Sequence, residues 1–322
     1  MANSLTRWVR ELLGVKERPP EIDPAATRPA PAVRLALDPD STQPLPELTD
    51  APIPDAQPRP FWPACDRRVL GIAQDVGRVR NHNEDTLMVF SGELGGLEPM
   101  PAFGLYVIAD GMGGHSLGER ASGVAARALT QSVLRALSPS LLARPDEDDI
   151  ERPLLTDVME TAILEANQAV HAHVPDGGTT VTAALVIGDS VVIGHVGDSR
   201  AYFLHPAGCE PLTRDHSLVQ RLKELGQITD EEAAIHPQRS VLYRAVGQGD
   251  GLEVDVISRR IDPGSRLLLC SDGMWGLVPD HVILQIARQA EGPQAAATEL
   301  VEAANLAGGP DNISVIIVQF PG

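Results

Sequence analysis

Short apolar runs that stop at turn residues are the feature that most constrains the fold of this 322-residue chain. The runs are rich in β-branched side chains, and most end at Gly, Asp or Asn, as strands that lead into turns do. The predicted strands are Val69–Ala73, Phe103–Ala109, Val181–Ile187, Val191–Val196, Ala201–Leu204, Arg266–Cys270 and Ile313–Phe320. A core built mainly from β-sheet is therefore expected.

Longer helical patterns lie between these runs in pairs. The predicted helices are Gly118–Leu137, Thr156–His171, Asp280–Gln289 and Pro293–Ala307, with an acidic loop broken by proline, Ser138–Pro153, between the first two. The order of strands, two helices, strands, two helices and a closing strand does not alternate as βαβ units do. It predicts an α+β fold, a four-layer α-β-β-α sandwich in which a central antiparallel β-sandwich is flanked by helix pairs.

Residues 1–64 differ sharply in composition from the rest of the chain. They hold 13 of the 27 prolines, and from Pro19 to Pro63 the sequence is Pro, Ala, Asp and Thr with scattered apolar residues and no periodicity. This composition favours an extended, disordered linker over a packed domain. We therefore expect two parts: residues 1–64, a short amphipathic helix plus a Pro-rich linker, and residues 65–322, a folded domain.

The amphipathic helix is predicted at residues 4–16. Its apolar residues recur at helical spacing and form one stripe; they are Leu5, Trp8, Val9, Leu12 and Leu13. One interpretation is a helix that docks onto a partner protein or a membrane surface. The alternatives are a helix packed on the folded domain and a frayed tail, because so short a helix is marginal alone.

The net charge of −18 argues against a nucleic-acid partner, because a phosphate backbone would be repelled. No apolar run approaches the roughly 20 residues that a membrane span requires. Arg7, Arg10 and Glu11 interrupt the apolar N-terminus, which argues against a signal peptide. Three cysteines do not make a disulfide framework. The expected location is cytoplasmic, with recruitment to a membrane or a complex through the N-terminus.

The segment from Arg80 to Asp85 reads Arg-Asn-His-Asn-Glu-Asp. An arginine five residues before an aspartate, with Glu84 beside it, offers a bidentate anion clamp next to hard oxygen ligands. Read alone, the segment fits a polar turn between two strands better than it fits a site.

Further acidic residues stand at the ends of apolar runs, namely Asp110, Asp198, Asp272 and Asp311. Gly111 follows Asp110, and a glycine lets the backbone approach a ligand closely, so that its carbonyl can coordinate a cation. An ordinary Asp-Gly turn would explain any one of these positions. Together with Asp85 there are five acidic positions at the ends of apolar runs, which is more than turns alone explain. Gathered carboxylates need cations to offset their repulsion. Without a His or Cys cluster, the ligands point to Mg²⁺ or Mn²⁺ and not to zinc.

Together these segments resemble the PPM family, the metal-dependent type 2C protein serine/threonine phosphatases, in its bacterial branch. The resemblance covers about residues 68–320 and runs through seven motifs in order. They are Arg80-x-x-Asn-Glu-Asp85, Asp110-Gly-Met-Gly-Gly-His115, Gly178-Thr-Thr180, Val196-Gly-Asp-Ser-Arg-Ala-Tyr202, Thr213-x-Asp-His-Ser217, Ser271-Asp-Gly273 and Asp311-Asn312. Seven motifs in order are far more specific than any one of them.

The resemblance implies a site of two Mn²⁺ or Mg²⁺ ions at one end of the β-sandwich. Asp110 is expected to bridge both ions. The other implied ligands are Asp85 and the Gly111 carbonyl for one ion, and Asp272 and Asp311 for the second.

Further roles follow from the same resemblance. Glu84 is expected to contact metal-bound water, Arg80 to hold the phosphate, and Asp198 to form a third, weaker metal site with Asp272. Residues 215–245 correspond to a flap beside the active site, within a catalytic domain that spans residues 65–322.

The implied function is hydrolysis of phosphoserine and phosphothreonine in protein substrates, opposing bacterial serine/threonine kinases. A hydroxide that bridges the two ions attacks phosphorus in line, and the ions and Arg80 stabilise the charged oxygens. The alternatives are a catalytically silent member of the family that acts as a regulatory binding module, and a phosphatase of small phosphate esters. The metal carboxylates are all present, which argues against a silent module, and the flap suits protein substrates better than small esters.

Overall fold

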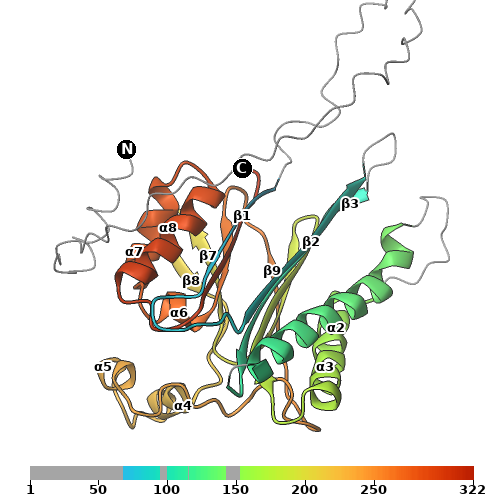
Figure 1. The fold of residues 1–322 in the computed structure, drawn as a ribbon. Helices are drawn as coiled ribbons and strands as arrows, with labels where there is room; N and C mark the ends of the chain where they lie inside the picture. Colours follow the sequence, from blue (N-terminus) through green and yellow to red (C-terminus); the bar gives the residue numbers. More distant parts are fainter. Residues whose placement is uncertain (1–67, 95–99, 115, 143–152) are drawn as a thin grey trace, which may run out of the picture. The chain divides into compact units, whose positions relative to one another are not determined.

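Two antiparallel sheets form the centre of the folded part of the chain. The computed structural model describes residues 68–94, 100–114, 116–142 and 153–322. One sheet has the strand order β1-β11-β10-β7-β8. The other has the order β2-β3-β5-β6-β9, with β4 paired to the end of β3. Both sheets, and the helices that cover them, are drawn in Figure 1.

The first sheet contains β1 (Val69–Asp75), β7 (Arg200–His205), β8 (Gly208–Pro211), β10 (Arg266–Cys270) and β11 (Ile313–Gln319). The second contains β2 (Asp85–Leu94), β3 (Met100–Met112), β4 (Gly178–Thr179), β5 (Val181–Ile187), β6 (Ser190–Val196) and β9 (Asp255–Arg260). The helices are α2 (Ser116–Leu141), α3 (Leu155–His173), α4 (Leu218–Glu224), α5 (Asp230–Ala234), α6 (Asp272–Trp275), α7 (Asp280–Gln289) and α8 (Pro293–Leu306).

Strand side chains alternate between an inner and an outer apolar layer. Tyr106 and Ile108 of β3 pack between the sheets, in one cluster with Leu267 and Leu269 of β10. The residues between them on β3, such as Val107, face the opposite side. Because both faces of these strands are buried, their sequences read as continuous apolar runs, and those runs made the strands visible in the sequence.

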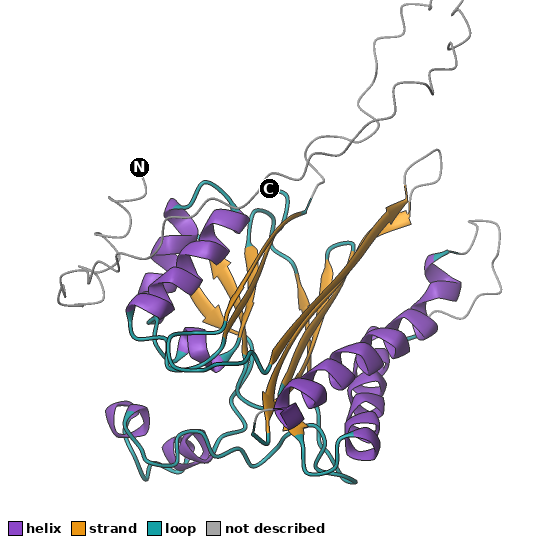
Figure 2. Cartoon of the chain, viewed as in Figure 1, coloured by secondary structure: helices purple, strands orange, loops and turns teal. Residues whose placement is uncertain are grey.

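Helices cover the outer face of each sheet. On one side, Leu129 of α2 and Ile163 of α3 are buried in one cluster with Val107. On the other side, Ile283 of α7 and Leu300 of α8 are buried with residues of β10 and β11. Figure 2 shows the order helix pair, sheet, sheet, helix pair. The predicted α+β class and its four-layer α-β-β-α arrangement are confirmed.

Most of the strands that the sequence did not predict are edge strands, although β1, which also lies at an edge, was predicted. β8 reads Gly-Cys-Glu-Pro, and β9 carries the exposed Arg259 and Arg260. β2 was also missed, and its outer residue Phe90 is exposed. Polar and proline residues at sheet edges prevent pairing with other chains, and they also dilute the apolar signal that marks a strand.

The predicted end of the first helix was wrong. The segment Ser138–Pro153 was expected to be a loop, but helix α2 continues through Pro139 to Leu141. The N–H of Leu142 still donates to the carbonyl of Ser138 at 3.0 Å. Pro139 has no N–H to donate, but the residues after it keep theirs, so the helix continues past the proline instead of ending at the residue before it.

The predicted flap, residues 215–245, contains the two short helices α4 and α5. The described residues all belong to one compact unit. The predicted docking helix at residues 4–16, and the linker up to residue 64, lie outside the described residues. Among the helices that the structure describes, none is long and apolar enough to cross a membrane.

Candidate active site

Asp85 and Asp110 lie opposite each other at one end of the second sheet. Asp85 begins β2 and pairs in register with Asp110 on β3. Two threonines hold the backbone of Asp110: Thr180 Oγ1 accepts its N–H at 2.9 Å, and Thr179 Oγ1 donates to its carbonyl at 2.8 Å. The two carboxylates are therefore carried by paired strands and not by mobile loops.

Two serines from the first sheet bind the Asp85 carboxylate. Ser314 Oγ, on β11, donates to Asp85 Oδ2 at 2.6 Å, and Ser271 Oγ, just after β10, donates to the same oxygen at 2.8 Å. The backbone N–H of Ser314 donates to Ser271 Oγ at 3.0 Å. Since Asp85 is only 7% exposed, these bonds fix the orientation of a buried carboxylate.

Asp272 follows β10 and begins helix α6. Its turn packs very closely on the segment that carries Asp311, because a Cβ added at Gly273 would stand 2.0 Å from the carbonyl oxygen of Asn312. Only glycine fits there. Besides burial, the charge of Asp272 also contributes to the raised pKa of Asp110, so the ends of the two sheets come close at these side chains.

Arg80 reaches the same region from the segment between β1 and β2. Its Nη2 donates to Asp311 Oδ2 at 2.7 Å. This bond is the main reason why the pKa of Arg80 is raised, and Glu84 and Asp110 contribute to the same effect. The Arg80 side chain is 47% exposed, so its guanidinium group contacts both Asp311 and the solvent.

Asn312 holds the segment that carries Arg80 and Glu84. Its Nδ2 donates to the carbonyls of Val76 and His82, each at 2.9 Å, and its Oδ1 accepts the N–H of Glu84 at 2.8 Å. Asn312 is 3% exposed. One buried side chain therefore fixes both ends of the arginine-bearing segment.

Glu84, Gly111 and helix α2 meet beside these carboxylates. The N–H of Gly111 donates to the carbonyl of Glu84 at 3.2 Å. A Cβ at Gly111 would stand 2.2 Å from the carbonyl oxygen of Gly118, and a Cβ at Gly118 would stand 2.7 Å from Glu84 Oε2. The close approach of strand and helix thus depends on both glycines.

Asp198 lies between β6 and β7 and is joined to the flap through Trp275 and Arg200. Trp275 Nε1 donates to the Asp198 carbonyl at 2.9 Å, and the Arg200 guanidinium lies 3.4 Å from the centre of the Trp275 ring. Arg200 also binds both oxygens of Asp215, at 2.8 and 2.7 Å. Asp215 is the first residue of the flap, so the flap is anchored next to Asp198.

The five aspartates that meet here, which we call the acidic cluster, are Asp85, Asp110, Asp198, Asp272 and Asp311. Burial raises the pKa of Asp85 to about 7, although the two serine bonds oppose this change. Burial, followed by the charge of Asp311, raises the pKa of Asp272 to about 6. The pKa values of Asp110 and Asp198 are also raised, first by burial and then by neighbouring aspartates. These carboxylates resist ionising together, which a bound divalent cation would offset.

The donor set fits a divalent cation that prefers oxygen ligands. As the side chains stand, no three His, Cys, Asp or Glu residues in the described part of the chain enclose a cation position. Two carboxylate oxygens in the acidic cluster, Asp85 Oδ1 and Asp272 Oδ1, are nevertheless buried and have no hydrogen-bond partner. A buried carboxylate oxygen without a donor is costly unless a cation binds it.

The structure brings all the sequence-predicted site residues together. Arg80, Glu84, Asp85, Asp110, Gly111, Asp198, Asp272 and Asp311 lie in one continuous network. Sequence reasoning assigned no role to Ser271, Ser314 or Asn312, which bind and position these residues. Ser271 and Asn312 adjoin predicted ligands in the sequence, and this adjacency was the available signal. No signal marked Ser314, which lies within an apolar strand.

An oxygen-rich acidic cluster at one end of a four-layer sandwich, with an arginine beside it, has the chemistry expected of a phosphate-ester hydrolase that uses divalent cations. Comparison with known proteins gives the same class. Residues 100–301 match the family described as protein phosphatase 2C. A serine/threonine phosphatase, Stp, of Listeria monocytogenes is 35% identical over 245 residues, which cover 76% of this chain and 93% of that protein.

Solved structures agree. The serine/threonine phosphatase PstP/Ppp of Mycobacterium tuberculosis superposes with a TM-score of 0.63 at 35% identity, over 79% of this chain and 99% of that one. The catalytic domain of a PstP in complex with two manganese ions has a TM-score of 0.64 at 32% identity, with coverage of 79% and 99%. The chain belongs to the protein phosphatase 2C family, which confirms the resemblance, the fold class and the predicted enzyme class.

Proposed function

We propose that the acidic cluster is the metal site of this phosphatase. The proposed ligands are Asp85, Asp110, Asp272, Asp311 and the Gly111 carbonyl. The chain is a metal-dependent protein serine/threonine phosphatase, as its family and its relatives indicate, and it acts on phosphoprotein substrates. The observation that carries the site assignment is the pair of buried, unpartnered oxygens, Asp85 Oδ1 and Asp272 Oδ1, within one group of carboxylates.

Two ions, Mn²⁺ or Mg²⁺, are proposed. Asp110 would bridge them, because it pairs in register with Asp85 and also lies close enough to Asp272 for their charges to interact. A PstP relative was solved with two manganese ions, which supports the same number here. Asp198 and Asp272 are the proposed ligands of a third, weaker ion, since their charges act on each other.

A divalent cation in such a site supplies Lewis acidity, which makes a coordinated water more acidic and polarises phosphoryl oxygens. The chain's own residues do the rest. Arg80 presents a planar fork to the phosphate oxygens of the substrate, and its bond to Asp311 orients that fork. Glu84, whose backbone N–H is held by Asn312, would contact water bound to the metal ions.

The matched pair Asp272→Asn and Asp280→Asn tests this proposal. Asp280 is exposed in the first turn of α7 and has no place in the acidic cluster. Asp272→Asn is expected to lose Mn²⁺ in a direct metal titration and to lower p-nitrophenyl phosphate turnover by at least ~10²-fold. Asp280→Asn should match the wild type in both. EDTA should abolish activity and added Mn²⁺ or Mg²⁺ should restore it; full activity in metal-free buffer would overturn the site assignment.

The domain organisation forms part of the same proposal. Residues 65–322 are the catalytic domain, residues 215–245 are a flap that shapes access for phosphoproteins, and residues 4–16 dock the enzyme onto a partner or a membrane surface through the linker. The anchoring of Asp215 beside Asp198 supports the flap assignment. The physiological substrates are proposed to be proteins that bacterial serine/threonine kinases phosphorylate.

A further inference from the structure

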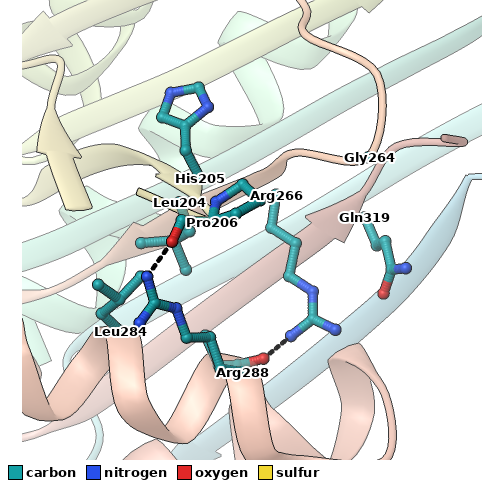
Figure 3. Close-up of a pocket in the computed structure, with 9 residues that line it drawn as sticks. Leu204, His205, Pro206, Gly264, Arg266, Leu284, Arg288 and Gln319 are labelled. Atoms are coloured by element: carbon teal, nitrogen blue, oxygen red, sulfur yellow. Dashed lines mark hydrogen bonds between the residues drawn. The ribbon is translucent and has the colours of Figure 1, made fainter. Parts of the chain in front are cut away.

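A pocket of about 310 Å³ lies outside the acidic cluster, between the first sheet and helix α7. Figure 3 shows it in close-up. Its lining includes three apolar residues, Leu204, Pro206 and Leu284, and two arginines, Arg266 and Arg288. Nothing in the phosphatase reaction uses these side chains.

The pocket lies at the opposite end of the strands that carry the catalytic residues. Arg266 on β10 pairs in register with Leu204 on β7 and Gln319 on β11, and all three residues line the pocket. Cys270, at the other end of β10, leads directly to Asp272. Cys270 lies four positions after Arg266 on β10, a distance of about 13 Å at roughly 3.3 Å per residue. A ligand in the pocket therefore would not overlap the active site.

Among the described residues, the hydrogen-bond partners of the two arginines are neutral carbonyl groups. A guanidinium N–H of Arg266 donates to the carbonyl of Ala287, and one of Arg288 donates to the carbonyl of Pro206. Neither forms an ion pair with a carboxylate of the described residues, whereas Arg244 and Arg260 do. Burial lowers the pKa of Arg266, and no acidic neighbour offsets the effect. Both guanidinium groups therefore carry a charge that no described carboxylate pairs with at this pocket.

The acidic residues near the pocket face its histidine. Glu210 and Asp262 each place a carboxylate oxygen 3.6 Å from a ring nitrogen of His205. In Figure 3 the His205 ring points away from the guanidinium groups of Arg266 and Arg288. The pocket thus combines apolar walls with two cations whose charge remains available to a ligand.

We propose that this pocket binds a small organic anion, with its acidic group on the guanidinium groups of Arg266 and Arg288 and its apolar part against Leu204, Pro206 and Leu284. The planar fork of arginine binds phosphate and carboxylate groups in the same way. The volume lies at the lower end of the range of small-molecule sites, which corresponds to a ligand the size of a substituted aromatic acid.

Binding can be measured on the Mg²⁺-loaded full chain with two probes, phenylphosphonate and benzoate, which separate phosphate-like from carboxylate ligands. Titration followed by backbone amide NMR should shift signals of residues 204–206, 264–266 and 284–288. Arg266→Gln and Arg288→Gln should each weaken this binding by about tenfold or more. Leu284→Phe keeps both charges and fills the pocket, so it should also abolish binding.

Arg259→Gln is the matched control, since it removes an exposed arginine outside the pocket. It should leave the affinity unchanged, and all four variants should keep wild-type turnover of p-nitrophenyl phosphate. The proposal is wrong if neither probe shifts these signals, or if Arg288→Gln and Leu284→Phe bind as the wild type does. These two variants also decide the question if Arg266→Gln fails to fold.

Discussion

The hydroxyl of Ser314, on β11 of one sheet, donates a 2.6 Å hydrogen bond to the carboxylate of Asp85, on β2 of the other sheet. The two residues are 229 positions apart in the chain. Ser271 donates to the same oxygen, Oδ2. The other oxygen of this carboxylate, Oδ1, has no hydrogen-bond partner, and the two bonds to Oδ2 fix its orientation. Contacts of this kind orient a metal ligand and tune its affinity.

Ser314→Ala is therefore expected to weaken Mn²⁺ binding by about tenfold, because Asp85 loses one of the two donors that orient it. The measurement is a metal titration followed by phosphatase activity. At saturating Mn²⁺ the turnover should recover to near the wild-type value, since no ligand has been removed. Ser258→Ala, at an exposed position on β9, is the control. An unchanged metal affinity in Ser314→Ala would remove this serine from the metal site.

The second prediction concerns Arg80. Arg80→Ala should raise KM for phosphopeptides. The fall in kcat/KM should correspond to a loss of roughly 2–4 kcal/mol of transition-state stabilisation, because Arg80 also contacts the phosphate in the transition state. Arg80→Lys should recover only part of the loss, because an ammonium cannot replace the planar fork. Arg78→Ala, two residues earlier in an exposed position, should behave as the wild type. Normal kinetics in both Arg80 variants would show that Arg80 does not bind the phosphate.

The third prediction concerns the stability of the metal-free protein. The pKa of Asp85 is raised to about 7 in the folded state, mainly by burial, whereas an unfolded chain keeps the ordinary value near 3.8. The folded state thus holds a proton that the unfolded state releases, so this stability is fully present below about pH 4 and is lost as the pH rises through 7. In EDTA, the contribution of Asp85 should lower Tm between about pH 5 and pH 7, and it should change little at higher pH.

Mn²⁺ should reduce this loss, because the cation offsets the ionised carboxylates. Asp85→Asn in EDTA should lose less Tm than the wild type over the same interval, since it has no proton to release at that position. Asp280→Asn is the control for removal of an exposed acid. If the chelated wild type and Asp85→Asn show the same pH profile, the carboxyl of Asp85 does not titrate near neutral pH.

Sequence reasoning located most of the sandwich because its central strands are buried on both faces. The run Val181–Ile187 was predicted with the bounds that β5 has in the structure, and Arg266–Cys270 with those of β10. Edge strands such as β9 have one face in solvent, and their charged residues hide the pattern. The end of α2 was misplaced because the sequence does not show whether a proline such as Pro139 lies within the last turn of a helix or just after the helix.

The acidic positions of the site were also visible in the sequence, because each stands where an apolar run ends. Their partners were not visible, since hydrogen bonds between residues 186 and 229 positions apart depend on how the two sheets pack. The Arg80–Asp311 ion pair is of the same kind. The pocket that contains Arg266 and Arg288 has no motif either, because the sequence does not show which residues of β7, β10, β11 and α7 the fold brings together.

The last prediction concerns residues 1–64, which we propose address the enzyme and take no part in chemistry. Every proposed ligand lies at or beyond Asp85, and a tether raises local concentration without changing a site that it does not reach. Deleting residues 1–64 should leave p-nitrophenyl phosphate turnover within about twofold of the full chain. It should reduce turnover of the physiological phosphoprotein or change where the enzyme is found.

Trp8→Ala combined with Leu12→Ala should reproduce the deletion, because these are the largest side chains on the predicted apolar stripe. Arg7→Ala combined with Arg10→Ala, mainly off the stripe, is the matched control if an apolar contact does the docking. A lipid surface would respond to both pairs, since basic residues also contribute to membrane binding. If the shortened protein stays folded but loses activity on the small substrate, residues 1–64 act on the catalytic domain itself and the tether proposal is wrong.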